Sequence, residues 1–335
     1  MQLVSQRIRR LGLVVLLCTV LSSAASVAQT VVYTVNYPLA YFAERIGGET
    51  VSVRFPAPAH VDPAFWMPDL EIIAAYQAAD VILLNGAGYA RWVGQASLPR
   101  RKLVDTSRSF RDAYLPGEEI AGHQHGPAGA HTHGLIAFTT WLDPQQAIAQ
   151  ARSIEVALAM HNAADAPALA RRADALVADL EQLDRDLATA FAEFGEEPLL
   201  ASHPIYAYLA RRYGLDLRSF SWEPDLEPGE AGWQALDVLL AETPVSWMLW
   251  EATPLDSIGK KLAARGVGVL VYKIVGNRPA SGEFLSVMRA NVEMLVHAVG
   301  RATPLSRIGS RTAPSFSDSK SEGVSRAGRE IAALP

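Results

Sequence analysis

The sequence has 335 residues, of which 50% are hydrophobic, and a formal net charge of −5. This much apolar material can form a substantial core, and the length favours two domains of roughly 120 to 150 residues each. The negative charge and the lack of a basic stripe argue against a nucleic-acid partner.

The N-terminus has the pattern of a secretory signal peptide. Basic residues precede an apolar run at 11–21, and Ser26-Val27-Ala28 offers a small-x-small cleavage site. The run is too short to span a membrane. The only cysteine, Cys18, follows Leu17 rather than the small residue of a lipoprotein signal. We therefore predict that residues 1–28 are removed, and that any metal ligands are His, Asp, Glu or backbone oxygen.

The next segment alternates between strands and helices. Runs of β-branched residues predict strands, and apolar residues at helical spacing predict helices. In chain order these are a strand at 31–35, a helix at 38–46, a strand at 51–55, a helix at 70–79 and a strand at 81–84. This order is typical of a parallel α/β lobe. Ligands bind at the carboxyl ends of such strands, where the loops 56–68 and 85–88 would lie.

A histidine-rich loop at 121–134 is the best clue to function. It carries half of the chain's eight histidines, namely His123, His125, His131 and His133. Imidazole is the commonest neutral metal ligand. The four histidines form two His-x-His pairs, and such pairs on a flexible chain can converge on one ion. The loop therefore indicates handling of a divalent metal such as zinc. The alternative is a solvated loop that happens to be rich in histidine.

The second half is helical first and then alternates again. Residues 144–194 form an almost wholly helical stretch, interrupted near 162–167, which we expect to link two lobes. The second lobe, 195–300, has strands predicted at 198–201, 217–220, 246–250 and 267–272, and helices at 205–213, 229–242, 255–265 and 283–300. Residues 301–335 are rich in Ser, Arg and Gly and are predicted to be a mobile tail.

Several short motifs share their order with a known family. They are residues 37–48 (YPLAYFAERIGG), Val61-Asp62-Pro63, Ala78-Ala79-Asp80-Val81, Asn85-Gly86-Ala87-Gly88, Trp141-Leu142-Asp143-Pro144, residues 202–215 (SHPIYAYLARRYGL), Leu226-Glu227-Pro228 and Asn291. Across about 31–300 the chain resembles the zinc- and manganese-type solute-binding proteins of bacterial ABC metal importers. The resemblance implies two Rossmann-like α/β lobes, here 29–143 and 195–300, joined by one long backbone helix, with an ion between them.

The resemblance also implies where the metal ligands should stand. The family's pattern places histidines after Asp62-Pro63, two residues before Trp141 and in the Ser202-His203 segment, and a carboxylate after a late strand. Here these four positions read Ala64, Thr139, His203 and Lys273, with Tyr272 as an alternative for the last. A protonated lysine about 4 Å from a divalent ion costs roughly 8 kcal/mol at an effective dielectric of ~20. The usual site would bind a divalent ion poorly if Lys273 faced it.

Two hypotheses for the cleft follow. In the first, the ligands have moved, and His60, His203 and one or two loop histidines hold the ion. In the second, the cleft binds a metal chelate or an organic anion. Its lining would then be mostly apolar, with Lys273 as the one cation. The other lining residues would be Ala64, Phe65, Trp66, Met67, Thr139 and Trp141. Glu251 follows a predicted strand and points to the same cleft, either as a ligand or as a partner for Lys273.

Two other classes of function are weaker. In an enzyme, His203 could act as a general base that Glu251 orients. However, the sequence has no nucleophile elbow, phosphate loop or His-Glu-x-x-His helix to accompany this pair. A periplasmic metal buffer or chaperone would carry metal on the histidine-rich loop alone. We therefore expect a monomeric periplasmic protein that delivers a divalent metal to an ABC permease in the inner membrane. Zinc is the metal we expect.

Overall fold

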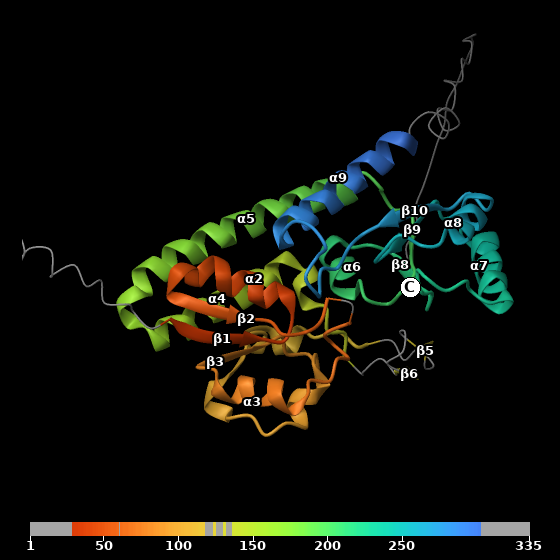
Figure 1. The fold of residues 1–335 in the computed structure, drawn as a ribbon. Helices are drawn as coiled ribbons and strands as arrows, with labels where there is room; N and C mark the ends of the chain where they lie inside the picture. Colours follow the sequence, from red (N-terminus) through yellow and green to blue (C-terminus); the bar gives the residue numbers. More distant parts are fainter. Residues whose placement is uncertain (1–28, 60, 118–122, 125–129, 132–135, 303–335) are drawn as a thin grey trace, which may run out of the picture.

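The computed structural model describes residues 29–59, 61–117, 123–124, 130–131 and 136–302. The predicted signal peptide, the tail from 303 onwards, His60 and most of the histidine-rich loop lie outside the described residues. Figure 1 shows two lobes, each built on a parallel four-stranded sheet. The two-lobed α/β fold predicted from the sequence is confirmed.

The N-terminal lobe holds a sheet of order β2-β1-β3-β4. Its strands are β1 (Thr30–Thr34), β2 (Val51–Arg54), β3 (Val81–Leu84) and β4 (Leu103–Asp105). Helix α2 (Tyr37–Gly47) begins where Asn36 accepts the N–H of Leu39, and α3 (Leu70–Ala78) begins where Asp69 accepts the N–H of Ile72. Figure 1 shows α3 on one face of the sheet and α2 on the other. The short strand β4 was not predicted.

The C-terminal lobe repeats this plan with order β10-β9-β7-β8. Its strands are β7 (Leu199–Ala201), β8 (Leu217–Ser219), β9 (Trp247–Trp250) and β10 (Gly268–Val271), and its helices are α6 (Ala207–Tyr213), α7 (Glu230–Glu242), α8 (Asp256–Ala263) and α9 (Phe284–Ala302). Helix α6 ends at Gly214, whose φ of +66° is the left-handed conformation that a glycine C-cap favours. A separate apolar cluster around Trp222, Trp233 and Met248 packs the outer side of this lobe.

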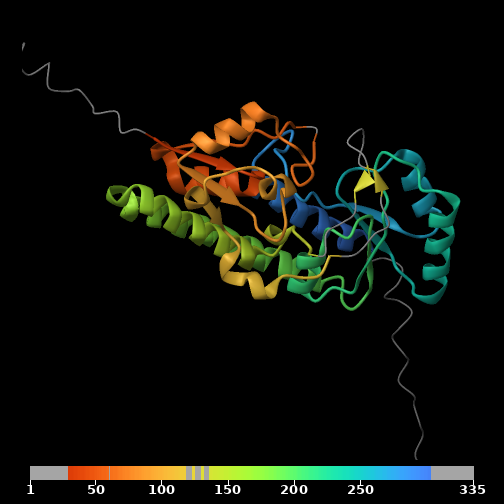
Figure 2. The ribbon, with the colours of Figure 1, turned by 90° about the horizontal axis from the view of Figure 1, so that it is seen from below.

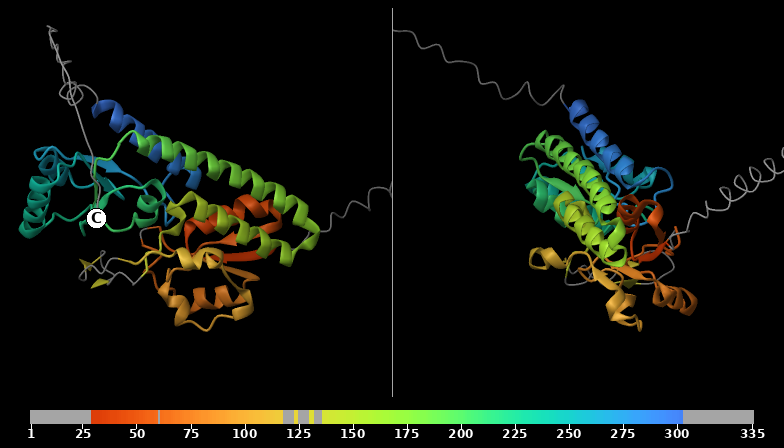
Figure 3. Two further views of the ribbon diagram at one scale, coloured as in Figure 1. Left: turned by 180° about the vertical axis from the view of Figure 1, so that it is seen from behind. Right: turned by 90° about the vertical axis from the view of Figure 1, so that its left-hand side faces the viewer.

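The predicted linking segment 144–194 forms two helices instead of one. Helix α4 (Pro144–His161) starts at the capping residue Asp143, and the chain reverses after Asn162 to enter α5 (Ala166–Ala192). The two helices pack against each other. Only α5, with 27 residues, runs from the far end of the N-terminal lobe to the C-terminal lobe, and α9 lies beside it (Figures 1, 2 and 3). The sequence showed the interruption, but the reversal depends on how α4 packs.

Short elements complete the description. They are the 3-10 helices η1 (Gly48–Thr50), η2 (Arg91–Gly94), η3 (Arg100–Lys102), η4 (Arg108–Ala113), η6 (Thr140–Leu142) and η7 (Ala163–Asp165), and the two-residue strands β5 (His123–Gln124) and β6 (Ala130–His131). None of the helices in the described part of the chain is both long enough and apolar enough to cross a membrane.

Candidate metal centre

Four charged or ligating side chains stand in a row at the carboxyl edge of the C-terminal sheet. His203 follows β7, Glu223 follows β8, Glu251 directly follows β9 and Lys273 follows β10. With the strand order β10-β9-β7-β8, the row reads Lys273, Glu251, His203, Glu223. This is the edge at which parallel α/β sheets bind their ligands.

Backbone hydrogen bonds beyond the strands bring His203 and Glu223 together. The N–H of Ser202 donates to the carbonyl of Leu249, and the N–H of Trp222 donates to the carbonyl of Ser202, each at 2.8 Å. These bonds extend the pairing of β7 with β8 and β9 past the strand ends. The residues that follow Ser202 and Trp222, which are His203 and Glu223, are therefore held next to each other at the edge of the sheet.

The side chains of His203, Glu223 and Glu251 converge. One potential ligand atom from each lies within 4.8 Å of the other two, and this is the one such group of three among the described residues. The Nε2 of His203 is 3.3 Å from an oxygen of Glu223, and the His203 side chain is 1% exposed. Ligands about 2.0–2.2 Å from a tetrahedral zinc ion lie roughly 3.3–3.5 Å apart. The group therefore approximates a cation site of one nitrogen and two carboxylates.

Two members of the group, His203 and Glu251, line a cavity of about 610 Å³ between the lobes. The C-terminal lobe contributes His203, Glu251, Lys273 and Arg278, among others, to its lining. The N-terminal side contributes aromatic residues, which are Phe65, Tyr89, Phe138 and Trp141. A solute held by the ligand group would therefore touch both lobes.

A model of the family described as "Zinc-uptake complex component A periplasmic" matches residues 32–298. The chain belongs to this family. The resemblance predicted from its motifs is thereby confirmed.

Within the zinc-uptake component A family, several characterised relatives are distant. The zinc-binding lipoprotein AdcA of Streptococcus pneumoniae is 24% identical over 284 residues, 82% of this chain and 56% of AdcA. The iron-binding protein YfeA of Yersinia pestis is 24% identical over 268 residues, 77% of this chain and 83% of YfeA. The high-affinity zinc uptake system protein ZnuA of Bacillus subtilis is 25% identical over 236 residues, 70% of this chain and 74% of ZnuA. This chain thus spans about half the length of AdcA.

Solved structures share the family's fold. The Zn(II)-bound ZnuA-like domain of Streptococcus pneumoniae AdcA superposes with a TM-score of 0.69 at 20% identity, covering 81% of this chain and 99% of that domain. The metal-dependent lipoprotein YcdH of Bacillus subtilis superposes with a TM-score of 0.68 at 21% identity, covering 80% of this chain and 98% of YcdH. The chain therefore shares its overall fold with these two proteins.

Thr139, one of the family positions that lacks a ligand here, connects the lobes instead, and so does the nearby Trp141. Thr139, 2% exposed, donates its hydroxyl hydrogen bond to the carbonyl of Ile205. The indole of Trp141 donates to the carbonyl of Ile274 at 2.7 Å. Both residues line the cavity, but their polar groups are occupied by the C-terminal lobe. They shape the cavity without offering a ligand to an ion.

The structure places Ala64 and Trp66 differently from the expectation that they line the cleft. Ala64 is 3% exposed in the core, and its N–H donates to the carboxylate of Asp62 at 2.8 Å. This tight turn directs Asp62 and Phe65 into the cavity, whereas neither Ala64 nor Trp66 is among its lining residues. Sequence position alone does not show which side chain of a turn faces inward.

The other predicted histidine ligands fall largely outside the described residues. His60 does, although Ala59 and Val61 on either side of it line the cavity. His125 and His133 do as well. For His123 and His131 the structure gives the backbone, in which they are directly paired across β5 and β6. The ribbon of β5 and β6 extends beneath the C-terminal lobe in Figure 1.

Glu223 was missed by sequence reasoning. The rule that selected Glu251, a carboxylate just past a predicted strand, applies equally to Glu223 beyond the strand at 217–220. Which strand ends adjoin depends on the sheet order, and the sequence alone does not give that order. The structure adds Glu223 because β8 lies next to β7.

Two buried tyrosines near the ligand group are kept neutral. Burial, together with the negative charge of Glu251, raises the pKa of Tyr206, whose hydroxyl donates to the carbonyl of Tyr272 at 2.9 Å. Burial, together with the charge of Asp62, raises the pKa of Tyr89. Neither tyrosine supplies an anionic oxygen at neutral pH, so the carboxylates remain the negative groups of the site.

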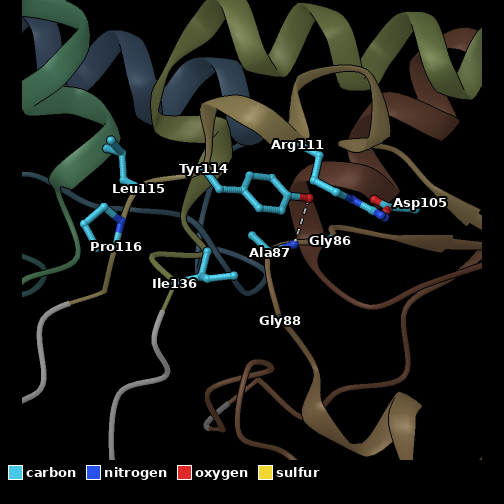
Figure 4. Close-up of a pocket in the computed structure, with 9 residues that line it drawn as sticks. All are labelled: Gly86, Ala87, Gly88, Asp105, Arg111, Tyr114, Leu115, Pro116 and Ile136. Carbon is cyan, nitrogen blue, oxygen red and sulfur yellow. Dashed lines mark hydrogen bonds and ion pairs between the residues drawn. The ribbon is translucent and has the colours of Figure 1, made fainter.

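A second cavity, of about 630 Å³, lies beside the loop that follows β3. Its polar groups are already paired, as Figure 4 shows: Arg111 reaches Asp105 at 2.6 Å, and the N–H of Ala87 donates to the hydroxyl of Tyr114 at 3.1 Å. Gly86, with φ +75°, is required here because a Cβ would lie 1.8 Å from the hydroxyl of Ser107. This cavity gathers no ligating group comparable to His203 and its neighbours among the described residues.

Proposed function

We propose that the chain is the periplasmic substrate-binding component of an ABC importer for a divalent metal, with zinc as the ion. The observation that carries this proposal is the convergence of His203, Glu223 and Glu251, the first and last of which line the cavity between the lobes. The family's description as a zinc-uptake component, and the zinc- or iron-binding names of the relatives, support it. A transport role also agrees with the expectation that the chain is not an enzyme.

The proposed ligand set differs from the set that the sequence motifs implied. One buried imidazole and two carboxylates would hold the ion, and the two carboxylates would neutralise its double charge. His60 is our candidate for a fourth ligand because its neighbours Ala59 and Val61 line the same cavity. The site would thus have lost the ligands at Ala64, Thr139 and Lys273 and gained Glu223 and Glu251.

The lobes are held together beside this site. The amide of Asn277 donates to the carbonyls of Pro58 and Val61, at 2.7 Å each, across the cavity mouth. The N–H of Tyr37 donates to the carbonyl of Gly276 at 3.0 Å. With α5 spanning both lobes, we expect small rocking movements on binding and release, with delivery of the ion to a membrane permease by a monomer.

We assign the histidine-rich loop a separate role as a weak collector of metal. His123, His125, His131 and His133 would bind zinc with lower affinity than the cavity, because the loop 121–134 contains no Asp or Glu to balance the charge of the ion. The loop's base is fixed: the N–H of Ala137 donates to the carbonyl of Leu115 at 2.9 Å, and Pro116 pairs with Ile136. A buffer that uses the loop alone is the competing function.

A competition titration of the exported, untagged protein with zinc against a chromophoric chelator tests the proposal. The native chain should bind one tight equivalent, and H203A should weaken it at least about 100-fold, since even changes next to metal ligands cost about 10–100-fold. H161A, at an exposed histidine of α4, is the matched control. Only weak binding of several equivalents, unchanged in H203A, would reject the proposal in favour of the buffer.

A further inference from the structure

The cavity beside the proposed metal ligands is much larger than an ion. It measures about 610 Å³, whereas one water takes up about 30 Å³ of liquid. Pockets that bind small organic molecules measure about 300–1,000 Å³. Without His60, the three described ligands leave one position open on a four-coordinate ion and two on the five-coordinate ion that zinc sometimes forms. The cavity therefore has room for a small organic molecule that touches the ion.

Lys273 places a positive charge at this cavity. Its backbone is fixed from both sides by Asn291, whose amide accepts the N–H of Lys273 at 3.1 Å and donates to its carbonyl at 2.9 Å. Asn291 is itself 3% exposed, so water competes little for these two hydrogen bonds. The ammonium group of Lys273 forms no ion pair with any residue that the structure describes. With both glutamates on the ion, an anion from outside would be its natural partner.

The opposite wall is aromatic and carries one unused donor. Phe138 meets Tyr89 and Phe65 edge-on, with ring centroids 5.4 and 5.9 Å apart, and Tyr89 meets Trp141 at 5.7 Å. Tyr89 is 7% exposed, yet its buried hydroxyl finds no hydrogen-bond partner among the described residues. A buried hydroxyl normally has a partner. A bound molecule with an aromatic ring and a carboxylate would supply one.

From these features we infer that the cavity binds the metal together with an anionic, aromatic chelator. This inference rests on the proposed function. The ion is held by His203, Glu223 and Glu251, and the chelator takes the place of His60 and fills the two remaining positions of a five-coordinate ion. The chelator's carboxylate meets Lys273, its ring lies against Phe138, and the Tyr89 hydroxyl donates to one of its oxygens. The transported solute is then a metal chelate, and Lys273 changes from an obstacle to a recognition residue.

Picolinate, a pyridine carboxylate that chelates zinc through its nitrogen and one oxygen, is a suitable probe. Equilibrium dialysis of the exported protein with zinc and radiolabelled picolinate should retain one equivalent of each, and picolinate without zinc should not be retained. K273M should keep its zinc but bind picolinate about tenfold or more weakly, since a charged hydrogen bond is lost. K260M, at an exposed lysine of α8, should match the native chain.

Two results would overturn the inference while leaving the proposed function in place. The first is retention of zinc with no picolinate, and the second is equal picolinate binding by K273M and K260M. If the protein retained neither zinc alone nor the zinc–picolinate complex, both proposals would fail. Y89F gives a further check, because it removes the hydroxyl with little change of shape and should weaken picolinate binding without weakening zinc binding.

Discussion

The imidazole Nε2 of His203 lies 3.3 Å from a carboxylate oxygen of Glu223, although the two residues follow different strands. The hydrogen bond from Trp222 to Ser202 holds them in register, so the pair is a product of the sheet. Glu251 approaches from the strand on the other side of β7. Because each residue of the site comes from a different strand end, substitution of any one of them should change metal binding by itself.

Glu223 should be needed for metal affinity. In E223Q the shape is kept but one negative charge is lost, so we expect zinc affinity to fall by about 10–100-fold. The chelator competition titration measures this. E181Q, at an exposed glutamate of α5, is the control and should not change. Equal affinities of E223Q and the native protein would remove Glu223 from the ligand set.

Lys273 should limit the affinity for the free ion. K273E replaces a positive with a negative charge at the end of the row, where the family's pattern has a carboxylate. We expect zinc to bind about tenfold or more tightly, because at least one repulsive contact is removed. K260E controls for net charge. Unchanged or weaker zinc binding in K273E would mean that the ammonium group lies too far from the ion to affect it.

Asn277 should slow the release of metal. N277A removes two hydrogen bonds to the loop around residue 60, each contributing about 1 kcal/mol. The lobes should separate more easily, and we expect zinc to leave about 10-fold faster when an excess of chelator is mixed in a stopped-flow experiment. N162A, in the turn between α4 and α5, breaks a hydrogen bond to Asp165 remote from the cavity and should leave the rate unchanged.

The histidine-rich loop should be dispensable for tight binding. Deleting residues 118–135 joins Gly117 to Ile136, which the pairing of Pro116 with Ile136 already brings close. Tyr208 supports the same base, since its hydroxyl accepts the N–H of Leu115 at 3.2 Å and donates to the carbonyl of Ala137 at 2.9 Å. The deletion should remove weak equivalents and retain the tight one. Loss of the tight equivalent would place loop histidines in the cavity site.

Asp184 should make stability depend on pH in the acid range. Burial would raise its pKa, but hydrogen bonds from Arg212, Gln145 and Tyr213 outweigh burial and lower the pKa below 3.8. The stabilisation is therefore present above about pH 4 and disappears as the pH falls through the lower, folded-state pKa.

D184N should flatten the decline in melting temperature on acidification and cost about 1–2 kcal/mol at neutral pH, a modest value because Arg212 is partly solvated. Thermal unfolding between pH 7 and pH 2 measures both effects. D186N changes a partly exposed aspartate on the same helix and serves as the control. Parallel curves for D184N and the native chain would contradict the assignment.

The sequence by itself determined the long helices, the strands other than β4, and the family. The reason is that alternation of apolar residues and caps such as Asn36 and Asp143 act over a few neighbouring positions. It also selected His203, since the motif around it is contiguous. Only the tertiary structure decided that Glu223 joins His203, that Ala64 turns into the core, and that Thr139 connects the lobes. These outcomes depend on sheet order and on contacts between distant segments, which no local pattern encodes.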